Sequence, residues 1–528
     1  METIKTKLHQ AILRSLKSCN YEFKDEIQLS YPNLSSYGDY TTNVAMQVAN
    51  LEATSPIKIA ECLKEKLLSD KFIIKTFSHV EVAKPGFINF FFSLKFLNKE
   101  AESILQSKVD YGVSELGKKK KVQIEFISAN PTGPLTLGNG RGGFYGDVLG
   151  NVLSRVGFKV EKEYLINDGG NQILMLGHSV LKDGEAQYHG EYIDKLNKEL
   201  GQEKNVMLVG EKAADIILNN IIKKTIEEKM KIKFDHWFSE KKELRNNDKL
   251  EKVLKKVKNY LYEKDGALWF KSEELGDNRD RVIKKSDGGL TYLAQDFVYL
   301  ENKLGERKFD KAIYIWGADH HGDVKGLLNG AEVLGYKGRV EVILTQFVRL
   351  IKDGQEVRMS KRAGNYVTMR ELIDLVGHDV TRFVFLMYSN SSHMDFDLNI
   401  AKKKSEKNPV FNVQYVNARI HSLLNQDEIT KKEIKKVSFD LTHNSEISLV
   451  SSLLKWPDIL EEIALTNRVQ LLPNYAMEIA DKFHHFYDQC RVISDGNVFV
   501  PRVHLLSLTQ KIYREILTTI GISIPNNM

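Results

Sequence analysis

The sequence has few cysteines and no long apolar segment, and each absence excludes a class of protein. Only three of 528 residues are cysteine (Cys19, Cys62 and Cys490), an odd number without the CxxC spacing of a zinc site. We therefore expect no disulfide framework and no protein-bound zinc or other metal, in keeping with a reducing cytoplasm. No stretch approaches the roughly 18 uninterrupted apolar residues of a transmembrane helix, so we expect no membrane span.

The excess of charge of one sign is also small. Lysine and arginine number 76 against 70 aspartates and glutamates, a formal net charge of +6. This suggests an anionic partner without establishing that the partner is nucleic acid. Near the start, Ile4, Leu8, Ile12 and Leu16 recur every fourth residue, which predicts an amphipathic helix over 1–20 rather than a secretory signal.

Changes of pattern along the chain predict three domains. Residues 1–116 read as a small α+β domain that ends before a run of lysines. Residues 117–376 alternate β-rich runs with helical patterns, as in a parallel sheet with crossover helices, and charged helices at about 181–276 suggest an insertion. Residues 377–528 predict an all-α domain. The β-rich runs of the middle domain are 122–127, 313–316 and 340–345.

A segment rich in glycine, 128–143, follows the first of these runs and precedes a predicted helix. Glycine lets backbone approach a ligand closely, and a helix N-terminus attracts phosphate. A nucleotide is therefore the expected ligand, at the carboxyl ends of the strands.

Other phosphate motifs and a structural alternative compete for this assignment. Gly112–Lys119 nearly matches the P-loop, but Lys119 stands where a Ser or Thr is required, so we reject it. Gly138, Gly140 and Gly143 match the dinucleotide fingerprint, although they lie well beyond the strand. These glycines alternatively serve only close packing of the helix on the sheet.

Two loops together resemble those of class I aminoacyl-tRNA synthetases. Pro131–Asn139 resembles the His-x-Gly-His loop, and Arg358–Arg362 resembles the Lys-Met-Ser-Lys loop. The resemblance narrows to the arginyl-tRNA synthetases and covers nearly the whole chain. It includes, in order, the segments 38–45, 84–88, 167–172, 190–192, 280–282, 316–322 and 408–415.

The resemblance implies both an architecture and a reaction. The fold would be a Rossmann-like parallel-sheet catalytic domain, with an N-terminal α+β domain that contacts tRNA and a C-terminal all-α anticodon-binding domain. The reaction would activate L-arginine with ATP to arginyl-adenylate and transfer it to the 3'-terminal adenosine of tRNA(Arg). Mg²⁺ would arrive with ATP as substrate. By the same similarity we expect a cytoplasmic monomer.

The resemblance places ATP at the two loops. Family members contact its phosphates with two histidines, where this chain has Thr136 and Asn139, and both keep a hydrogen-bond donor, so we expect retained activity. Lys361 is the expected cation for the departing pyrophosphate. The candidate catalytic residues are Thr136, Asn139, Ser360 and Lys361, and Gly138, Gly140, Gly317, Asp319 and Met359 join them as candidate ATP contacts.

Arginine needs hydrogen-bond acceptors, because its guanidinium group offers only donors and is always charged. Tyr292 and Asp296 lie four residues apart and would share a helix face, while Glu125 inside an apolar strand requires a partner or ligand. His320 and His321 would face opposite sides of a strand and share no metal. By resemblance, the arginine site comprises Glu125, Ser128, Asn130, Tyr292, Asp296 and His320.

The start of the helical domain combines aromatic, amide and cationic side chains, which are the ingredients of single-stranded RNA recognition. An alternative is that Phe411 and Tyr415 pack in the core. The candidate tRNA contacts are Asn408, Phe411, Gln414, Tyr415, Arg419 and Met528.

Two other functions compete with arginine–tRNA ligation. A dinucleotide-dependent oxidoreductase would use the Gly138–Gly143 fingerprint but leaves the second loop unexplained. A synthetase-like protein impaired by Thr136 and Asn139 would bind tRNA without consuming ATP.

Overall fold

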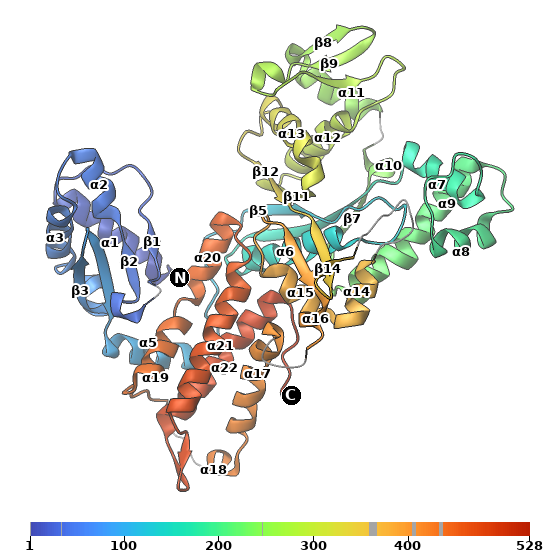
Figure 1. Ribbon diagram of the computed structural model, residues 1–528. Coiled ribbons are helices and arrows are strands. Elements are labelled where there is room, and N and C mark those ends of the chain that lie inside the picture. The colour runs from blue at the N-terminus through green and yellow to red at the C-terminus, as the bar shows by residue number, and fades with distance from the viewer. Residues whose placement is uncertain (1, 33, 245–246, 358–366, 404–407, 432–436) are drawn as a thin grey trace. The chain divides into compact units, whose positions relative to one another are not determined.

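The computed structural model describes residues 2–32, 34–244, 247–357, 367–403, 408–431 and 437–528 (Figure 1). Chain contacts divide it into two compact units. The first comprises Met1–Glu115, Phe411–Thr466 and Leu471–Met528, and the second comprises Leu116–Val410 and Asn467–Gln470. The α+β start of the chain and its helical end therefore belong to one discontinuous unit. Among the described helices, none combines the length and the apolar character needed to cross a membrane.

The first part of unit 1 is an α+β fold, as predicted. Its antiparallel sheet has the order β1-β2-β4-β3, and α1 (Ile4–Ser18) is the expected amphipathic helix, with Leu8, Ile12 and Leu16 buried. The strands are β1 (Leu29–Ser30), β2 (Tyr40–Thr42), β3 (Phe77–Ala83) and β4 (Phe87–Phe92). The other helices are α2 (Val44–Glu52), α3 (Pro56–Leu67), α4 (Lys71–Thr76) and α5 (Leu94–Gln106).

The cysteines of this part are paired, contrary to the sequence-based expectation. Cys19 at the end of α1 forms a disulfide with Cys62 on α3, across 43 residues of sequence. The expectation was wrong because α1 and α3 pack against each other, which sequence spacing does not reveal. Cys490 is free and buried.

The rest of unit 1 is helical and packs on the first part through a buried carboxylate. Asp458 on α20 accepts hydrogen bonds from the Tyr40 hydroxyl at 2.5 Å and the Lys5 backbone N–H at 3.1 Å. The helices are α17 (Pro409–Leu424), α18 (Asp427–Thr430), α19 (Asn444–Leu453), α20 (Trp456–Thr466), α21 (Leu471–Gln489) and α22 (Val500–Ile520). A short hairpin, β16 (Ile493–Ser494) with β17 (Asn497–Val498), joins the last two.

Unit 2 is built on the predicted parallel sheet, with strand order β12-β11-β5-β6-β7. Strand β7 lies inside the range 181–276 that was expected to be an insertion, so that range contributes the edge of the sheet. Four residues are too short a run to stand out in the sequence as a strand. The bounds are β5 (Lys121–Glu125), β6 (Lys159–Ile166), β7 (His236–Ser239), β11 (Lys311–Gly317) and β12 (Val340–Thr345).

Glycines bring helix α6 (Leu137–Arg155) close to one face of this sheet. Gly142, Gly146 and Gly150 recur every fourth residue, and a Cβ at Gly146 would lie 2.5 Å from the Phe126 ring. Figure 1 shows α12 (Tyr292–Leu300) and α13 (His321–Val333) on the opposite side of the sheet. The close approach fixes the N-terminus of α6 at the carboxyl end of β5.

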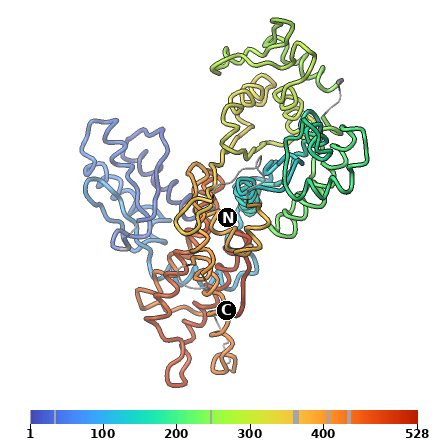
Figure 2. The backbone as a smooth tube through the Cα atoms, turned by 45° about the vertical axis from the view of Figure 1, so that its right-hand side comes forward, coloured from blue at the N-terminus to red at the C-terminus, as the bar shows by residue number. Residues whose placement is uncertain are grey.

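Smaller elements complete unit 2. Gly177 and Gly210 lie where α7 and α9 meet, and because they have no side chain the two helices can approach closely. Figure 2 shows α7 to α9 as a compact cluster in green. The helices are α7 (Asn171–Leu181), α8 (Glu191–Leu200), α9 (Val206–Ile216), α10 (Glu240–Glu243), α11 (Asn247–Lys256), α14 (Met369–Val376), α15 (His378–Leu386) and α16 (Leu398–Ala401). Two further sheets contain β8 (Leu261–Lys264), β9 (Ala267–Phe270) and β10 (Arg281–Lys284), and β13 (Val348–Lys352), β14 (Gln355–Glu356) and β15 (Met394–Asp397).

Candidate active site

A cavity of about 810 Å³ opens at the carboxyl ends of β5 and β11, beside the N-terminus of α6. All six residues predicted to bind arginine line it: Glu125, Ser128, Asn130, Tyr292, Asp296 and His320. So do five predicted ATP contacts: Thr136, Gly138, Asn139, Gly317 and Asp319. The remaining loop residues Met359, Ser360 and Lys361 lie outside the described residues. Side chains separated by almost two hundred residues thus share one cavity.

The two residues that replace the family's histidines cap helix α6. The backbone N–H of Asn139 donates to Thr136 Oγ1 at 3.4 Å, and Asn139 Oδ1 accepts from the Thr136 backbone N–H at 3.0 Å. This reciprocal capping box fixes both side chains at the helix N-terminus, where the backbone partial charge is positive. The Nδ2 group of Asn139 makes no hydrogen bond with the described residues, so it can donate to an anion.

The structure does not bring Gly140 to the cavity. A Cβ at this position would lie 2.1 Å from Met369 Sδ, so the missing side chain serves the packing of α6 against α14. A Cβ at Gly143 would likewise meet Met230 and Ile127 within 3 Å. The close packing of Gly140 and Gly143 favours the structural alternative for these two glycines, whereas Gly138 lines the cavity, and a contact of Gly140 with ATP stays a prediction.

The sequence analysis treated the two adjacent histidines as residues of a strand, but the structure places them elsewhere. His320 ends a short 3₁₀ helix, η7 (Ala318–His320), and His321 begins α13. His320 lines the cavity with its ring 5.8 Å from Trp316, while His321 does not line it. The strand β11 ends three residues earlier, so the alternation of a strand does not apply to this pair.

A row of polar side chains crosses the sheet at the floor of the cavity. In strand register, Tyr314 pairs with Glu125, Glu125 with Glu163, and Glu163 with His236. Residues in register on neighbouring strands point to the same face, so these four side chains line up on one surface of the sheet. Buried charges in such a row require compensation.

Helix α12 and its π-helical extension η6 (Glu301–Glu306) supply that compensation. Lys303 Nζ lies 2.6 Å from Glu125 Oε2, and Lys303 is completely buried. Arg307 forms ion pairs with Glu161 and Glu163, and the Tyr299 hydroxyl donates to Glu163. The buried partner that the sequence demanded for Glu125 is therefore Lys303, which sequence analysis missed. Its spacing of seven residues from Asp296 suggests that both lie on one helix face, but the sequence does not show that this face meets Glu125.

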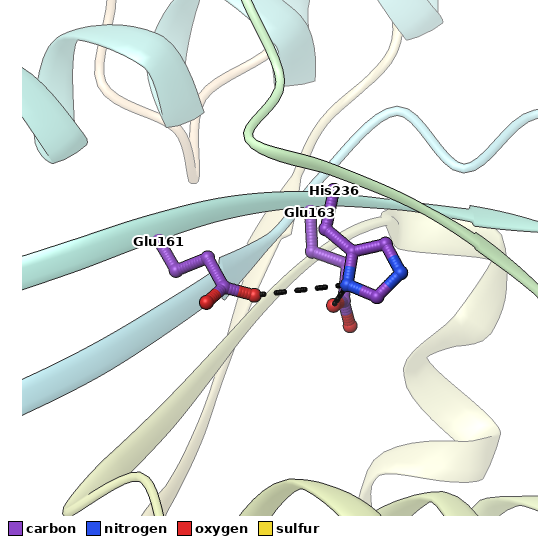
Figure 3. Close-up of side chains that lie close together, drawn as sticks. All are labelled: Glu161, Glu163 and His236. Carbon is purple, nitrogen blue, oxygen red and sulfur yellow. Dashed lines mark ion pairs between the residues drawn. The ribbon is translucent and has the colours of Figure 1, made fainter. Parts of the chain in front are cut away.

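The outer end of the row resembles a cation site. Glu161, Glu163 and His236 lie close together (Figure 3), with His236 Nδ1 3.5 Å from Glu163 and 4.0 Å from Glu161. Because Arg307 already forms ion pairs with both carboxylates, the cluster contains its own cation. We draw no metal site from it.

Asp296 on α12, in contrast to Glu125 and Glu163, has no ion pair or hydrogen bond among the described residues. It projects from α12 into the cavity wall. Burial, reinforced by repulsion from Glu125, raises its pKa to about 8. A bound guanidinium group would favour the charged form and match the carboxylate in a two-hydrogen-bond fork.

Arg141, another residue that sequence analysis missed, holds a wall of the cavity. Its guanidinium group is buried and donates to the carbonyls of Gln346 at 2.8 Å, Ser389 at 2.7 Å and Ser392 at 2.8 Å. Burial lowers its pKa to about 10. Because Gln346 and Phe347 line the cavity, these bonds tie that wall to helix α6.

Two of the predicted tRNA contacts have structural tasks. The Asn408 side chain accepts from the Val410 N–H at 3.1 Å and donates to the Lys403 carbonyl at 3.0 Å, so it organises the start of α17. Gln414 donates to the Ser523 hydroxyl at 2.8 Å and thereby holds the C-terminal segment. Both amide groups are engaged within the chain.

The other predicted tRNA contacts remain on the surface of α17 or at the chain end. The rings of Phe411 and Tyr415 stack with their centres 6.4 Å apart, and both residues are half-buried. Half-burial decides neither for RNA contact nor for core packing. Arg419 lies over the Tyr487 ring at 4.6 Å, and Met528 is exposed.

Family comparisons agree with this arrangement along the whole chain. Residues 2–92 match the arginyl tRNA synthetase N terminal domain, residues 100–384 the class I (R) tRNA synthetase catalytic domain, and residues 413–528 the DALR anticodon binding domain. These matches cover unit 1 and unit 2 alike.

Relatives of known identity extend the match to full length. The chain is 38% identical to arginine–tRNA ligase 1 of Halalkalibacterium halodurans over 100% of both chains, and 37% identical to arginine–tRNA ligase of Bacillus subtilis over 100% of this chain and 99% of that one. Arginyl-tRNA synthetase structures from Thermus thermophilus and Plasmodium falciparum share the fold over 100% of both chains, with TM-scores of 0.78 and 0.81 at 18% identity. The chain belongs to the class I arginyl-tRNA synthetase family.

Proposed function

We propose that this chain activates L-arginine with ATP and transfers the arginyl group to the 3'-terminal adenosine of tRNA(Arg). One observation carries the proposal: a single cavity contains the uncompensated carboxylate of Asp296 and the capped N-terminus of α6. The first suits a permanently cationic side chain, and the second suits a phosphate group. Both substrates would meet in the same space.

We propose the following roles for the groups that line the cavity. Asp296 and Tyr292 face the guanidinium, and Glu125, Ser128, Asn130 and His320 complete the arginine site. The arginine carboxylate attacks the α-phosphorus of ATP, the bond to the β-phosphate breaks, and pyrophosphate leaves. Because the carboxylate is already a nucleophile, orientation and charge stabilisation matter more than a protein base. Asn139 Nδ2 and the N–H groups of α6 supply donors for the phosphates.

In the second step the hydroxyl of the terminal adenosine attacks the arginyl carbonyl, and AMP leaves. Phe411, Tyr415, Arg419 and Met528 remain the candidate tRNA contacts on the helical part. Mg²⁺ would accompany ATP, supported by the charge of the triphosphate. By analogy with the family, we propose a monomer in the cytoplasm.

Arginine-dependent exchange of pyrophosphate into ATP tests the function. We expect exchange with arginine when tRNA is present, and none with lysine, whose ammonium group cannot form the fork with Asp296. Equal exchange with lysine would refute the assignment. Binding of tRNA without exchange would identify a catalytically impaired synthetase, and nicotinamide-dependent turnover would identify an oxidoreductase.

A further inference from the structure

Tyr314 differs from every other buried tyrosine in the described residues. It is 2% exposed, and its hydroxyl has no hydrogen-bond partner there. The hydroxyls of the other six all donate to carbonyl or carboxylate groups; these residues are Tyr40, Tyr145, Tyr164, Tyr299, Tyr475 and Tyr513. A buried hydroxyl without a partner lowers stability, so its retention requires a reason.

The position of Tyr314 supplies a reason for retaining its unpartnered hydroxyl. The residue lines the cavity and stands in register with Glu125 on the neighbouring strand. Lys303 Nζ lies 3.7 Å from the centre of its ring, so the ring face is occupied by the cation that pairs with Glu125. The face of this ring therefore has a partner, whereas the hydroxyl at its edge is buried and has none among the described residues.

The charges around the hydroxyl define the kind of ligand that it suits. Burial, and then the carboxylates of Glu125 and Asp296, raise the pKa of Tyr314 well above its usual value, so the phenol stays neutral. Nearby negative charge favours an orientation in which the hydroxyl proton points toward a carboxylate. The oxygen lone pair is then directed to a donor that carries positive charge.

We propose that the hydroxyl of Tyr314 accepts a hydrogen bond from the guanidinium group of bound arginine and so contributes to amino-acid specificity. This inference rests on the proposed function. A guanidinium group has five N–H donors, and a fork with the Asp296 carboxylate uses two of them. Glu125 forms an ion pair with Lys303, and the unpartnered hydroxyl of Tyr314, in register with Glu125, is a further acceptor beside it at the floor of the cavity.

The variant Tyr314→Phe tests the proposal because it removes the hydroxyl alone. We expect the KM for arginine to rise about tenfold, the loss of one hydrogen bond to a charged donor, while the KM for ATP changes less than twofold. The melting temperature should stay equal or rise, because the unpartnered hydroxyl is gone. Calorimetric titration with arginine should show the same loss of affinity without turnover.

Tyr513→Phe is the matched control. Tyr513 is buried in unit 1, and its hydroxyl donates to the Ala476 carbonyl at 3.1 Å. This variant should lower the melting temperature and leave the KM for arginine unchanged. Opposite effects of the same substitution on stability and binding would separate a ligand contact from a structural hydroxyl.

The outcomes distinguish this inference from the proposed function. If the wild-type chain exchanges pyrophosphate with arginine but Tyr314→Phe keeps its KM for arginine, the hydroxyl bonds only water and the inference is overturned. Equal increases in both KM values would also overturn it, since they would indicate a general disturbance of the cavity. Absence of arginine-dependent exchange in the wild-type chain would instead refute the proposed function.

Discussion

At the scale of single residues, the protonation of Asp296 links arginine binding to pH. Its pKa is raised to about 8, so below pH 8 the carboxylate binds a proton that a guanidinium must displace. Arginine affinity should therefore fall as pH drops from 8 to 6, by up to about tenfold per unit. Titration calorimetry in buffers of different ionisation enthalpy should show release of a proton at pH 7.

The variant Asp296→Asn provides the control for this prediction. It has no titrating group at this position, so arginine should bind weakly and with no dependence on pH between 6 and 8. The KM for ATP should change little, because the removed charge faces the guanidinium and not the phosphates. Comparable losses for arginine and ATP would contradict the role assigned to Asp296.

The buried pair of Lys303 and Glu125 predicts a large stability effect. Lys303→Met leaves the Glu125 carboxylate buried without a cation, and we expect a loss of about 3–5 kcal/mol in the free energy of unfolding. Urea denaturation measures it. Adding Glu125→Gln should restore much of the loss, since the uncompensated charge is then removed. A single variant as stable as the wild-type chain would show that Glu125 reaches solvent or binds a proton.

The sequence predicted which residues gather around the cavity better than how they are paired. The resemblance to the arginyl-tRNA synthetases placed Glu125, Tyr292 and Asp296 at one site, and all three line the cavity. The partners Lys303 and Arg141 escaped detection, because their contacts depend on which face of a helix meets which strand. A glycine that admits a ligand and one that admits another helix have the same sequence signature, so the sequence could not separate Gly138 at the cavity from Gly140 against α14.

At the scale of elements, helix α6 joins packing and ligand binding. Its glycine stripe brings it close to the sheet, and its capping box fixes the N-terminus at the cavity. Asn139→Asp keeps the capping oxygen but replaces the Nδ2 donor with an acceptor and adds negative charge. We expect the KM for ATP to rise at least about tenfold.

Stability measurements separate the two tasks of Asn139. Asn139→Asp should change the free energy of unfolding by less than about 1 kcal/mol, since a carboxylate at this third helical position accepts the same bond from the Thr136 N–H. Asn139→Ala removes this reciprocal bond of the capping box while Thr136 remains the N-cap, and it should cost about 1 kcal/mol. An unchanged KM for ATP in Asn139→Asp would mean that this side chain does not face a phosphate.

Most elements followed from periodicity, and those that did not have identifiable reasons. The amphipathic helix α1 and the parallel strands β5, β11 and β12 were predicted within a few residues. Strand β7 was missed because its pairing with β6 outweighs a weak local signal. Among the charged helices predicted for about 181–276, α9 continues as the π-helical segments η2 (Ile217–Lys223) and η3 (Thr225–Lys229). A sequence periodicity of 3.6 residues does not distinguish a π-helix from an α-helix.

At the scale of the whole molecule, the division into two units predicts two unfolding transitions. Each unit contains a buried aspartate that joins segments distant in sequence. In unit 1, Asp458 accepts a hydrogen bond from Tyr40. In unit 2, Asp147 forms ion pairs with Lys162, at 2.6 Å, and with Arg382. Asp458→Ala leaves the Tyr40 hydroxyl unpaired, and Asp147→Ala leaves Arg382 without its ion pair to that residue. Each variant should destabilise its own unit by about 2–4 kcal/mol.

Differential scanning calorimetry can assign the transitions, because the proposed ATP site is the cavity of unit 2, so ATP should raise only the transition of that unit. Asp147→Ala should then lower the ATP-sensitive transition by about 5–10 °C and leave the other in place. Asp458→Ala should do the reverse. If both variants lower one common transition equally, the units unfold as a single cooperative body, and the discontinuous unit 1 depends on unit 2 for its stability.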